Sequence, residues 1–141
     1  MAAGLIALQL RILARSRSVT RLVLRGTVRR RPEAVTPALL DRVMLHLRRS
    51  GAGAAFRRWE RREGGWNDLR TNYVDRLATL SVPTLIVHGA DDPVVPLAVV
   101  ERAQRLIPDC RLIVIPDCGH LAPLEQPEAV SSALDAFLQA V

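Results

Sequence analysis

Two stretches in the second half of the chain decide the fold: residues 82–96 read VPTLIVHGADDPVVP, and residues 115–128 read IPDCGHLAPLEQPE. The apolar run over 82–87 is continuous, which predicts a strand buried on both faces, and a second apolar run over 111–115 predicts its neighbour. A helical pattern over 97–106 lies between the two runs. A crossover of about 23 residues implies parallel strands with a right-handed connection.

A final helix follows the second strand, so residues 81–141 have the order β-α-β-α. The apolar residues on one face of this final helix are Val130, Leu134, Phe137, Leu138 and Val141. The first 80 residues instead show apolar positions at helical spacing, separated by polar breaks. We therefore expect an α/β chain with a helical region over 1–80, followed by a β-α-β-α unit with two parallel strands over 81–141.

Four helical segments are expected in the region 1–80. The first lies within 4–24, and the second begins at Thr36-Pro37, which resembles an N-cap followed by proline at the first helical position. The third is expected over 54–62 and ends at Gly64-Gly65. The apolar stripes are Leu40, Val43, Met44 and Leu47 in the second helix, and Leu69, Tyr73, Leu77 and Leu80 in the fourth. We expect Trp59 and Tyr73 to belong to the core rather than to a ligand site.

Loops that follow two parallel strands open at the same edge of a sheet, where open α/β sheets bind their ligands. The loop after the first predicted strand carries Asp92, and the loop after the second carries His120. A carboxylate that accepts a hydrogen bond from one imidazole nitrogen fixes the tautomer and stabilises the imidazolium. The other nitrogen is then free to take a proton from a nucleophile or a water. We therefore predict that Asp92 and His120 form a catalytic pair.

These two loops closely resemble the C-terminal section of α/β-hydrolase fold enzymes. In that family the catalytic acid lies three residues after the glycine that ends a strand, in a G-x-x-D-x-x-x-P pattern, and Gly89 and Pro96 frame Asp92 in this way. The family's histidine follows the last strand in a Gly-His pair, which here is Gly119-His120. The order of acid before histidine also agrees. The resemblance covers residues 82–141.

Residues 1–80 resemble the mobile helical cap that these enzymes insert before this section. The chain departs from the family upstream of it, because the nucleophile elbow G-x-S-x-G does not occur in the sequence. None of the six serines follows an apolar strand and opens a helix. About six earlier strands and the oxyanion-hole donors that they help to supply are missing as well. The resemblance therefore implies a partial α/β-hydrolase fold without a nucleophile.

The resemblance also implies a chemistry for the intact enzyme: hydrolysis of a carboxylic ester or similar acyl bond through a serine acyl-enzyme, without metal or cofactor. Asp92 is then the orienting acid and His120 the general base. The substrate is a small ester or apolar molecule, and in the family cap aromatics and leucines commonly line its pocket. Esterases, lipases, epoxide hydrolases, dehalogenases and carbon–carbon hydrolases share these loops, so the reaction subtype stays open. The chain by itself is expected to lack esterase activity.

Other polar residues have simpler interpretations. His88 ends a strand and is expected to be a structural core histidine, whereas His46 lies on the polar side of a helix and is expected to be solvated. Asp91 is expected to face solvent. Cys118 is close to His120 in sequence, but nothing except that histidine would lower the thiol pKa, so we do not expect a cysteine nucleophile. The sequence has no Cys/His spacing typical of zinc.

All 20 basic residues are Arg, and they are unevenly distributed. Residues 1–80 hold 17 Arg and 6 acids, a net charge of +11, whereas residues 81–141 hold 3 Arg and 8 acids, a net charge of −5. This asymmetry raises an alternative, a non-enzymatic basic helical module that binds an acidic partner or nucleic acid. The absence of Lys and the few aromatic residues argue against nucleic acid, so Arg29–Arg31 and Arg61-Arg62 are expected to be solvated or to face the cap.

Neither a membrane segment nor a secretory signal is expected. The apolar stretch 2–10 is about half of the roughly 20 residues that a membrane helix needs, and no positive charge precedes it. The Arg-rich, acid-free start also fits a transit peptide, although its Leu and Ile content is more typical of a packed helix. Cys110 and Cys118 bracket a strand, which places them beyond disulfide reach and predicts two reduced thiols in a cytoplasmic protein. The oligomeric state stays open, as does stable folding of so thin a core with an exposed strand edge.

Overall fold

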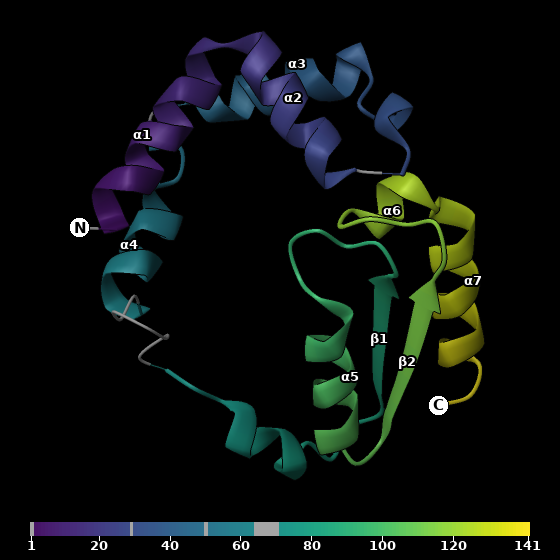
Figure 1. The fold of residues 1–141 in the computed structure, drawn as a ribbon. Coiled ribbons are helices and arrows are strands. Elements are labelled where there is room, and N and C mark those ends of the chain that lie inside the picture. Colours follow the sequence, from purple (N-terminus) through teal and green to yellow (C-terminus); the bar gives the residue numbers. More distant parts are fainter. Residues whose placement is uncertain (1, 29, 50, 64–70) are drawn as a thin grey trace. The chain divides into compact units, whose positions relative to one another are not determined.

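The computed structural model describes residues 2–28, 30–49, 51–63 and 71–141 (Figure 1). The elements in chain order are α1 (Ala2–Arg15), α2 (Arg17–Thr27), the short 3-10 helix η1 (Pro32–Ala34), α3 (Pro37–Arg48), α4 (Ala54–Glu63), the 3-10 helix η2 (Val74–Thr79), β1 (Thr84–Gly89), α5 (Leu97–Leu106), β2 (Cys110–Ile115), α6 (Ala122–Glu125) and α7 (Pro127–Leu138). They form two compact units, one of Met1–Leu24 and Val35–Asn72 and the other of Arg25–Ala34 and Tyr73–Val141.

The first unit is helical, and its helix α3 has a capped N-terminus. Thr36 caps α3, because its hydroxyl oxygen accepts a hydrogen bond from the Leu39 N–H at 3.2 Å, and Pro37 occupies the first turn. Leu40 and Met44 are buried, which confirms the predicted stripe, and His46 is exposed as expected. An ion pair between Arg17 and Asp41 joins α2 to α3.

Two expectations for the helical region are wrong. Trp59 on α4 is 44% exposed and Tyr73 is 61% exposed, so neither belongs to a core. The fourth helix is a 3-10 helix, η2, rather than a longer α-helix, and its residues Val74 and Leu77 line a pocket together with residues of α5. Gly64-Gly65, Trp66 and Leu69 lie outside the described residues.

The second unit contains the predicted β-α-β-α section. β1 and β2 pair in parallel, with Thr84 opposite Cys110 and Gly89 opposite Ile115. Helices α5 and α7 lie on opposite sides of the two strands (Figure 1). The core consists of Ile115, Cys118 and Ala122, packed against Val87, Ile113 and Val130.

Strand β1 and helix α7 are less buried than predicted. β1 begins at Thr84 rather than at 82, because Pro83 has no N–H to donate, and the Thr84 N–H reaches the Asp109 carbonyl at 2.8 Å. Residues 84–87 are only partly buried. On α7, Val130 and Ala133 face the core, whereas Leu134 and Leu138 are exposed, and so is Val141 beyond the end of the helix.

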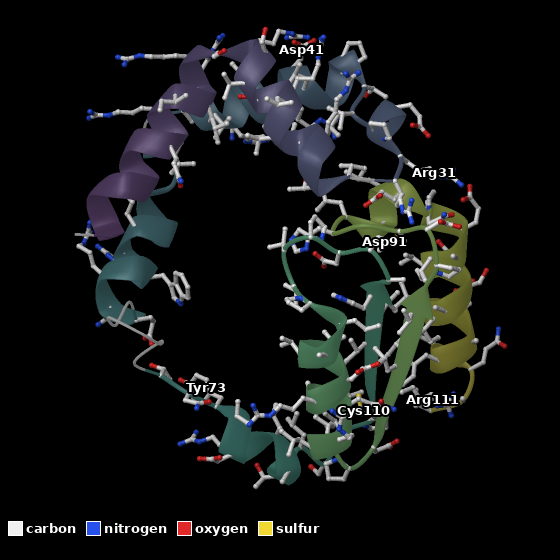
Figure 2. All side chains as sticks on the ribbon, in the orientation of Figure 1. Arg31, Asp41, Tyr73, Asp91, Cys110 and Arg111 are labelled. Carbon is white, nitrogen blue, oxygen red and sulfur yellow. The ribbon has the colours of Figure 1, made fainter. Side chains whose placement is uncertain are left out.

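Both strands end at the same edge of the sheet, and the two loops that follow them meet there. We call residues 90–96 the acid loop and residues 116–121 the histidine loop. Asp91 lies at this edge, whereas Cys110 lies at the opposite end of β2 (Figure 2). Cys110 and Cys118 are free thiols at opposite ends of the strand, as the spacing predicted.

Candidate active site

The acid loop holds the Asp92 carboxylate in a fixed orientation. Oδ1 accepts hydrogen bonds from the N–H groups of Val94 at 2.7 Å and Val95 at 3.0 Å, which closes a tight turn around the side chain. The side chain is 4% exposed. Because Oδ1 is committed to the loop, Oδ2 remains to face the neighbouring histidines.

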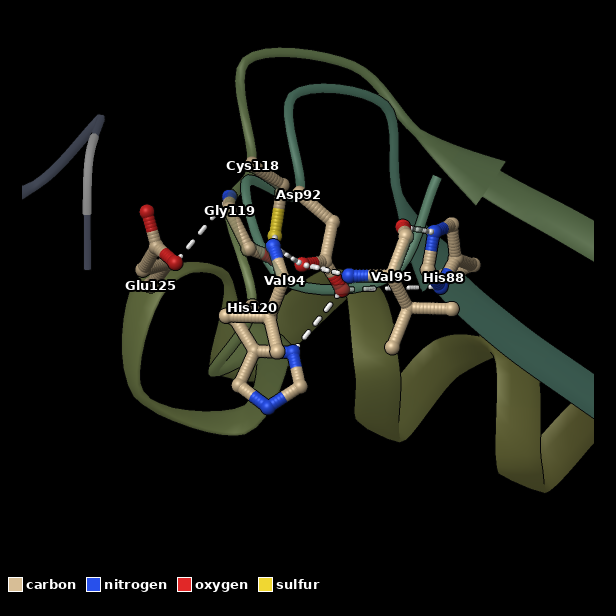
Figure 3. Close-up of polar contacts among 8 residues, drawn as sticks. All are labelled: His88, Asp92, Val94, Val95, Cys118, Gly119, His120 and Glu125. Carbon is tan, nitrogen blue, oxygen red and sulfur yellow. Dashed lines mark hydrogen bonds and ion pairs between the residues drawn. The ribbon is translucent and has the colours of Figure 1, made fainter. Parts of the chain in front are cut away.

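The histidine loop brings His120 to this oxygen. After β2 the chain turns at Asp117, whose φ of 48° lies in the left-handed region that Asp tolerates better than most residues. His120 Nδ1 then lies 2.9 Å from Asp92 Oδ2 (Figure 3). The structure thus brings together the two residues that the sequence analysis paired, across 28 positions of sequence.

The imidazole is oriented for proton transfer at its outer nitrogen. The carboxylate of Asp92 accepts the Nδ1–H, which leaves the lone pair on Nε2. In the part of the chain that the structure describes, Nε2 has no hydrogen-bond partner, and the side chain is 35% exposed. A group approaching from outside can therefore reach the basic nitrogen while the other nitrogen stays anchored.

Asp92 is held in its charged form. Burial by itself would raise its pKa, but the hydrogen bond from His120 and the two backbone N–H donors of the acid loop outweigh that cost, so the pKa is lowered. An ionised carboxylate at this distance stabilises a protonated imidazole. Asp92 therefore faces the imidazole as a carboxylate that accepts the Nδ1–H.

His88 supports the acid loop from the strand. It is buried, its Nε2 lies 3.1 Å from the Val95 carbonyl oxygen, and its Nδ1 lies 3.8 Å from Asp92 Oδ2. A ring nitrogen that meets a carbonyl must carry the proton, so the neutral ring is protonated on Nε2. This contact fits the structural role expected of His88 and places a second imidazole behind the carboxylate.

Close contact of the two loops depends on Gly89. The Asp91 N–H donates to the Cys118 carbonyl and the Ala90 N–H to the Ile115 carbonyl, both at 2.9 Å. A Cβ on Gly89 would overlap the Gly119 carbonyl oxygen and lie 2.5 Å from that of Cys118. Only glycine lets the backbones approach this closely.

Asp91 is partly exposed, as expected of a residue that faces solvent, but it also takes part in a surface ion pair. Asp91 Oδ2 accepts a hydrogen bond from Arg30 Nε at 2.8 Å, and a second Arg30 nitrogen lies 3.6 Å from Asp117. Arg30 therefore bridges the acid loop and the histidine loop rather than being simply solvated. Arg29 lies outside the described residues, and Arg61 and Arg62 are exposed.

Sequence reasoning missed two further anchors of the histidine loop. Glu125, at the end of α6, is fully buried and accepts the Gly119 N–H at 3.0 Å. The carbonyl of Thr27 accepts the His120 N–H at 3.1 Å. No sequence signal distinguishes Glu125 from the exposed Glu128, because both lie in the same acidic, proline-rich stretch.

Cys118 is placed as a core residue. It is fully buried, and burial together with the nearby carboxylates, first Glu125, raises its thiol pKa to about 11. A thiol in this setting is protonated at neutral pH and is a poor nucleophile. The other free thiol, Cys110, also has a raised pKa, chiefly because of burial.

Among the described residues, no group of three or more His, Cys, Asp or Glu side chains is arranged to hold a metal ion. Within the same residues, no helix has both the length and the apolar character required to cross a lipid bilayer.

Comparison with known proteins gives consistent matches. The model of the "Alpha/beta hydrolase family" matches residues 2–133. The 2-hydroxy-6-oxo-6-(2'-aminophenyl)hexa-2,4-dienoic acid hydrolase of Metapseudomonas resinovorans is 38% identical over 89 residues, which are 62% of this chain and 29% of that protein. The pimeloyl-[acyl-carrier protein] methyl ester esterase of Nitrosomonas europaea is 36% identical over 71 residues, 50% of this chain and 27% of that protein.

Solved structures extend the similarity into the helical region. A serine hydrolase involved in carbazole degradation, the CarC enzyme, superposes with a TM-score of 0.75 at 26% identity and covers 89% of this chain. A meta-cleavage product hydrolase from Pseudomonas fluorescens superposes with a TM-score of 0.73, also at 26% identity and over 89% of this chain. The matches span 48% and 46% of those two chains, so this chain corresponds to about half of their length.

Proposed function

The chain belongs to the alpha/beta hydrolase family, and we propose that it supplies the acid and the base of a hydrolase active site. In this proposal Asp92 is the orienting acid and His120 is the general base. The observation that carries it is the 2.9 Å contact between His120 Nδ1 and Asp92 Oδ2, with Nε2 directed away from the pair. The lowered pKa of Asp92 supports it, because the carboxylate stays ionised wherever the imidazole works as a base.

The proposed chemistry follows from the two ring nitrogens. Nε2 of His120 takes the proton of an attacking hydroxyl group, and the imidazolium that forms is stabilised by Asp92. When the tetrahedral intermediate collapses, the same nitrogen returns the proton to the leaving group. Water then repeats the cycle on the acyl-enzyme, so that the proton balance of His120 is restored after each turnover.

We propose that the nucleophile is a serine outside these 141 residues. The sequence contains no G-x-S-x-G elbow, and the family order places the nucleophile before the acid and the histidine. The match to about half of a protein named a serine hydrolase supports this division. Residues 1–80 then serve as the helical cap, and residues 81–141 as the C-terminal section of the catalytic core.

The proposed substrate is a small-molecule ester or a related apolar acyl compound. The methyl ester esterase among the relatives supports this class. A second candidate is cleavage of a carbon–carbon bond in a 2-hydroxy-6-oxo-dienoic acid. It is favoured by the match to a hydrolase named for such an acid, which covers 62% of the chain, against 50% for the esterase. No cofactor is required for either reaction in this proposal, and the proposed setting is cytoplasmic.

A hybrid enzyme tests this function with the full chain intact. The part of the carbazole-degradation hydrolase that precedes the matched region is joined in front of Met1, and hydrolysis of p-nitrophenyl acetate is measured. We expect activity in the hybrid and none in the chain alone. Asp92→Asn should lower kcat by about 10⁴-fold, because the amide favours the wrong imidazole tautomer.

The controls separate the catalytic role from loss of folding. His120→Ala should abolish hydrolysis, whereas His46→Ala, which removes an exposed histidine on α3, should not. Activity of the hybrid that survives His120→Ala would contradict the proposal. So would turnover by the chain alone that depends on His120. Assay of a 2-hydroxy-6-oxo-dienoic acid alongside the ester decides between the two substrate classes.

A further inference from the structure

The proposed mechanism leaves one buried carboxylate unused. Glu125, at the C-terminal end of α6, has no exposed surface, although a charged side chain is among the least favourable groups to bury. Such a group is retained only where hydrogen bonds compensate for the lost water. Its partners therefore indicate what it does.

Each oxygen of Glu125 accepts a different backbone donor. Oε1 accepts the Gly119 N–H at 3.0 Å, and Oε2 accepts the Arg30 N–H at 3.1 Å (Figure 3 draws the Gly119 contact). Gly119 directly precedes His120 in the histidine loop. Arg30 belongs to the stretch 25–34, which packs with the C-terminal unit although it lies far away in sequence.

The contact between Glu125 and Arg30 is also related to the position of His120. The His120 N–H donates to the carbonyl of Thr27 at 3.1 Å, and Thr27 lies on the same short stretch as Arg30. Glu125 thus holds the residue before the histidine directly, and it also holds the stretch that receives the histidine's own N–H. One backbone donor beside His120 is thus bound by Glu125 directly, and the His120 N–H is bound by a stretch that Glu125 also contacts.

We propose that Glu125 is a positioning residue that holds His120 Nδ1 within hydrogen-bond distance of Asp92. The inference rests on the proposed function of the Asp92–His120 pair and deepens it. Glu125 does not touch the reacting atoms. It acts through the backbone of Gly119 and through the stretch that contains Thr27 and Arg30.

The arrangement requires a carboxylate rather than another polar group of the same size. Two N–H donors meet two acceptor oxygens, so both donors are satisfied. In Glu125→Gln the side chain keeps its volume, but its NH₂ group must face one of the two N–H donors. One anchor is therefore lost while packing is preserved, and the loss releases either Gly119 or the stretch that holds Thr27.

The ¹⁵N NMR signals of the His120 ring in the full chain report the proposed effect. They are recorded at a pH at which the imidazole is neutral, where they distinguish an Nδ1–H from an Nε2–H tautomer. In the wild type we expect the Nδ1–H form, because Asp92 accepts that proton. In Glu125→Gln we expect most of the Nδ1–H form to be lost. Glu128→Gln makes the same chemical change at an exposed position on α7 and should leave the spectrum unchanged.

A purely structural role predicts a different result. Glu125→Gln would then lower the melting temperature but keep the Nδ1–H tautomer in the folded fraction, and this outcome overturns the proposal. If Glu125→Gln does not fold, Glu125→Asp, which keeps both oxygens on a shorter side chain, takes its place with the same criterion. If neither variant folds, hydrogen exchange in the wild type decides, because fast exchange of the Gly119 amide contradicts the anchor and slow exchange supports it.

The measurement does not depend on catalysis, so its failure is separable from failure of the proposed function. If the hybrid enzyme is inactive while Glu125→Gln shifts the tautomer, the positioning role stands and the hydrolase proposal fails. In an active hybrid, we expect Glu125→Gln to lower kcat at least tenfold with little change in KM. A change in KM alone would contradict an action through His120.

Discussion

The two oxygens of Asp92 have separate roles. Oδ1 accepts N–H groups of Val94 and Val95, and Oδ2 faces the imidazole of His120. The backbone contacts fix the carboxylate before any substrate arrives, so orientation of the histidine requires no rearrangement. The same contacts offset the cost of burying a charge and keep the pKa of Asp92 low.

The lowered pKa of Asp92 makes the stability of the chain sensitive to acid. A carboxyl group whose folded pKa lies below its unfolded value contributes stability above the unfolded pKa of about 3.9, and the contribution is lost as the pH falls through the folded pKa. We expect the unfolding free energy of the wild type to fall more steeply below about pH 4 than that of Asp92→Asn. Urea unfolding at several pH values measures this. Asp135→Asn, an exposed position on α7, should retain the wild-type slope.

The buried thiol of Cys118 should be unreactive in the folded chain. With a pKa of about 11, only about one thiol in a thousand is ionised at pH 8. We expect Ellman's reagent to modify the partly exposed Cys110 first and Cys118 only after unfolding by urea. Rapid modification of Cys118 in the native chain, tested in a Cys110→Ser variant, would indicate an accessible thiolate and reopen a cysteine nucleophile.

Sequence patterns predicted those helices and strands that local hydrogen bonding and hydrophobic periodicity determine. The cap at Thr36, helix α5 and the parallel pairing of two apolar runs follow from hydrogen-bond needs and from hydrophobic periodicity. Predictions from hydrophobic periodicity were wrong where tertiary contacts determine the helix type or the burial of a side chain. Periodicity does not distinguish a 3-10 helix from an α-helix over 74–79, and it assigned Trp59 to a core that the fold does not provide.

The candidate site was predictable only in part, for a related reason. Asp92 and His120 follow two parallel strands, so topology brings them together. The contacts of Glu125 and Arg30 connect segments 95 positions apart, and no topological rule specifies such a pairing. Long-range anchors of this kind become visible only when the fold places the segments side by side.

Replacement by alanine should change the stability of the chain differently at Gly89, where the two loops meet, and at Gly26, which has open space around it. A Cβ on Gly89 would overlap carbonyl oxygens of the histidine loop, so Gly89→Ala should destabilise the chain by at least about 2 kcal/mol. A Cβ on Gly26, in helix α2, has no atom within 4 Å, so Gly26→Ala should be neutral or stabilise by up to about 1 kcal/mol. Urea unfolding measures both. Equal stability of the two variants would refute the close approach at Gly89.

Some members of the arginine excess have a structural use. Arg17 pairs with Asp41 within the first unit, and Arg30 pairs with Asp91 and Asp117 within the second. The pKa values of Asp41 and Arg17 move apart because of their mutual hydrogen bond. These two arginines therefore hold elements together and contact carboxylates rather than being free for a polyanion.

Binding of duplex DNA tests the alternative of a basic binding module. Nonspecific affinity for DNA comes from released counterions and falls steeply with salt. Because several arginines are engaged internally and few aromatic side chains can stack on bases, we expect no measurable binding at about 0.15 M salt. Fluorescence anisotropy with a labelled duplex measures this. Submicromolar binding that weakens on Arg61→Ala and Arg62→Ala would favour the alternative instead.

The exposed apolar side chains of the second unit predict self-association of the chain alone. Leu138 is 67% exposed, Val82 is 58% exposed and Val99 is 55% exposed, and among the described strands β1 has β2 as its one neighbour. An unpaired strand edge beside apolar surface promotes association. Sedimentation velocity should show the mean mass rising with concentration, and Leu138→Glu should reduce the rise. In the hybrid enzyme, strands from the added segment can pair with β1, so we expect a mass that is independent of concentration. A chain that remains monomeric at high concentration would show that its own packing covers these groups.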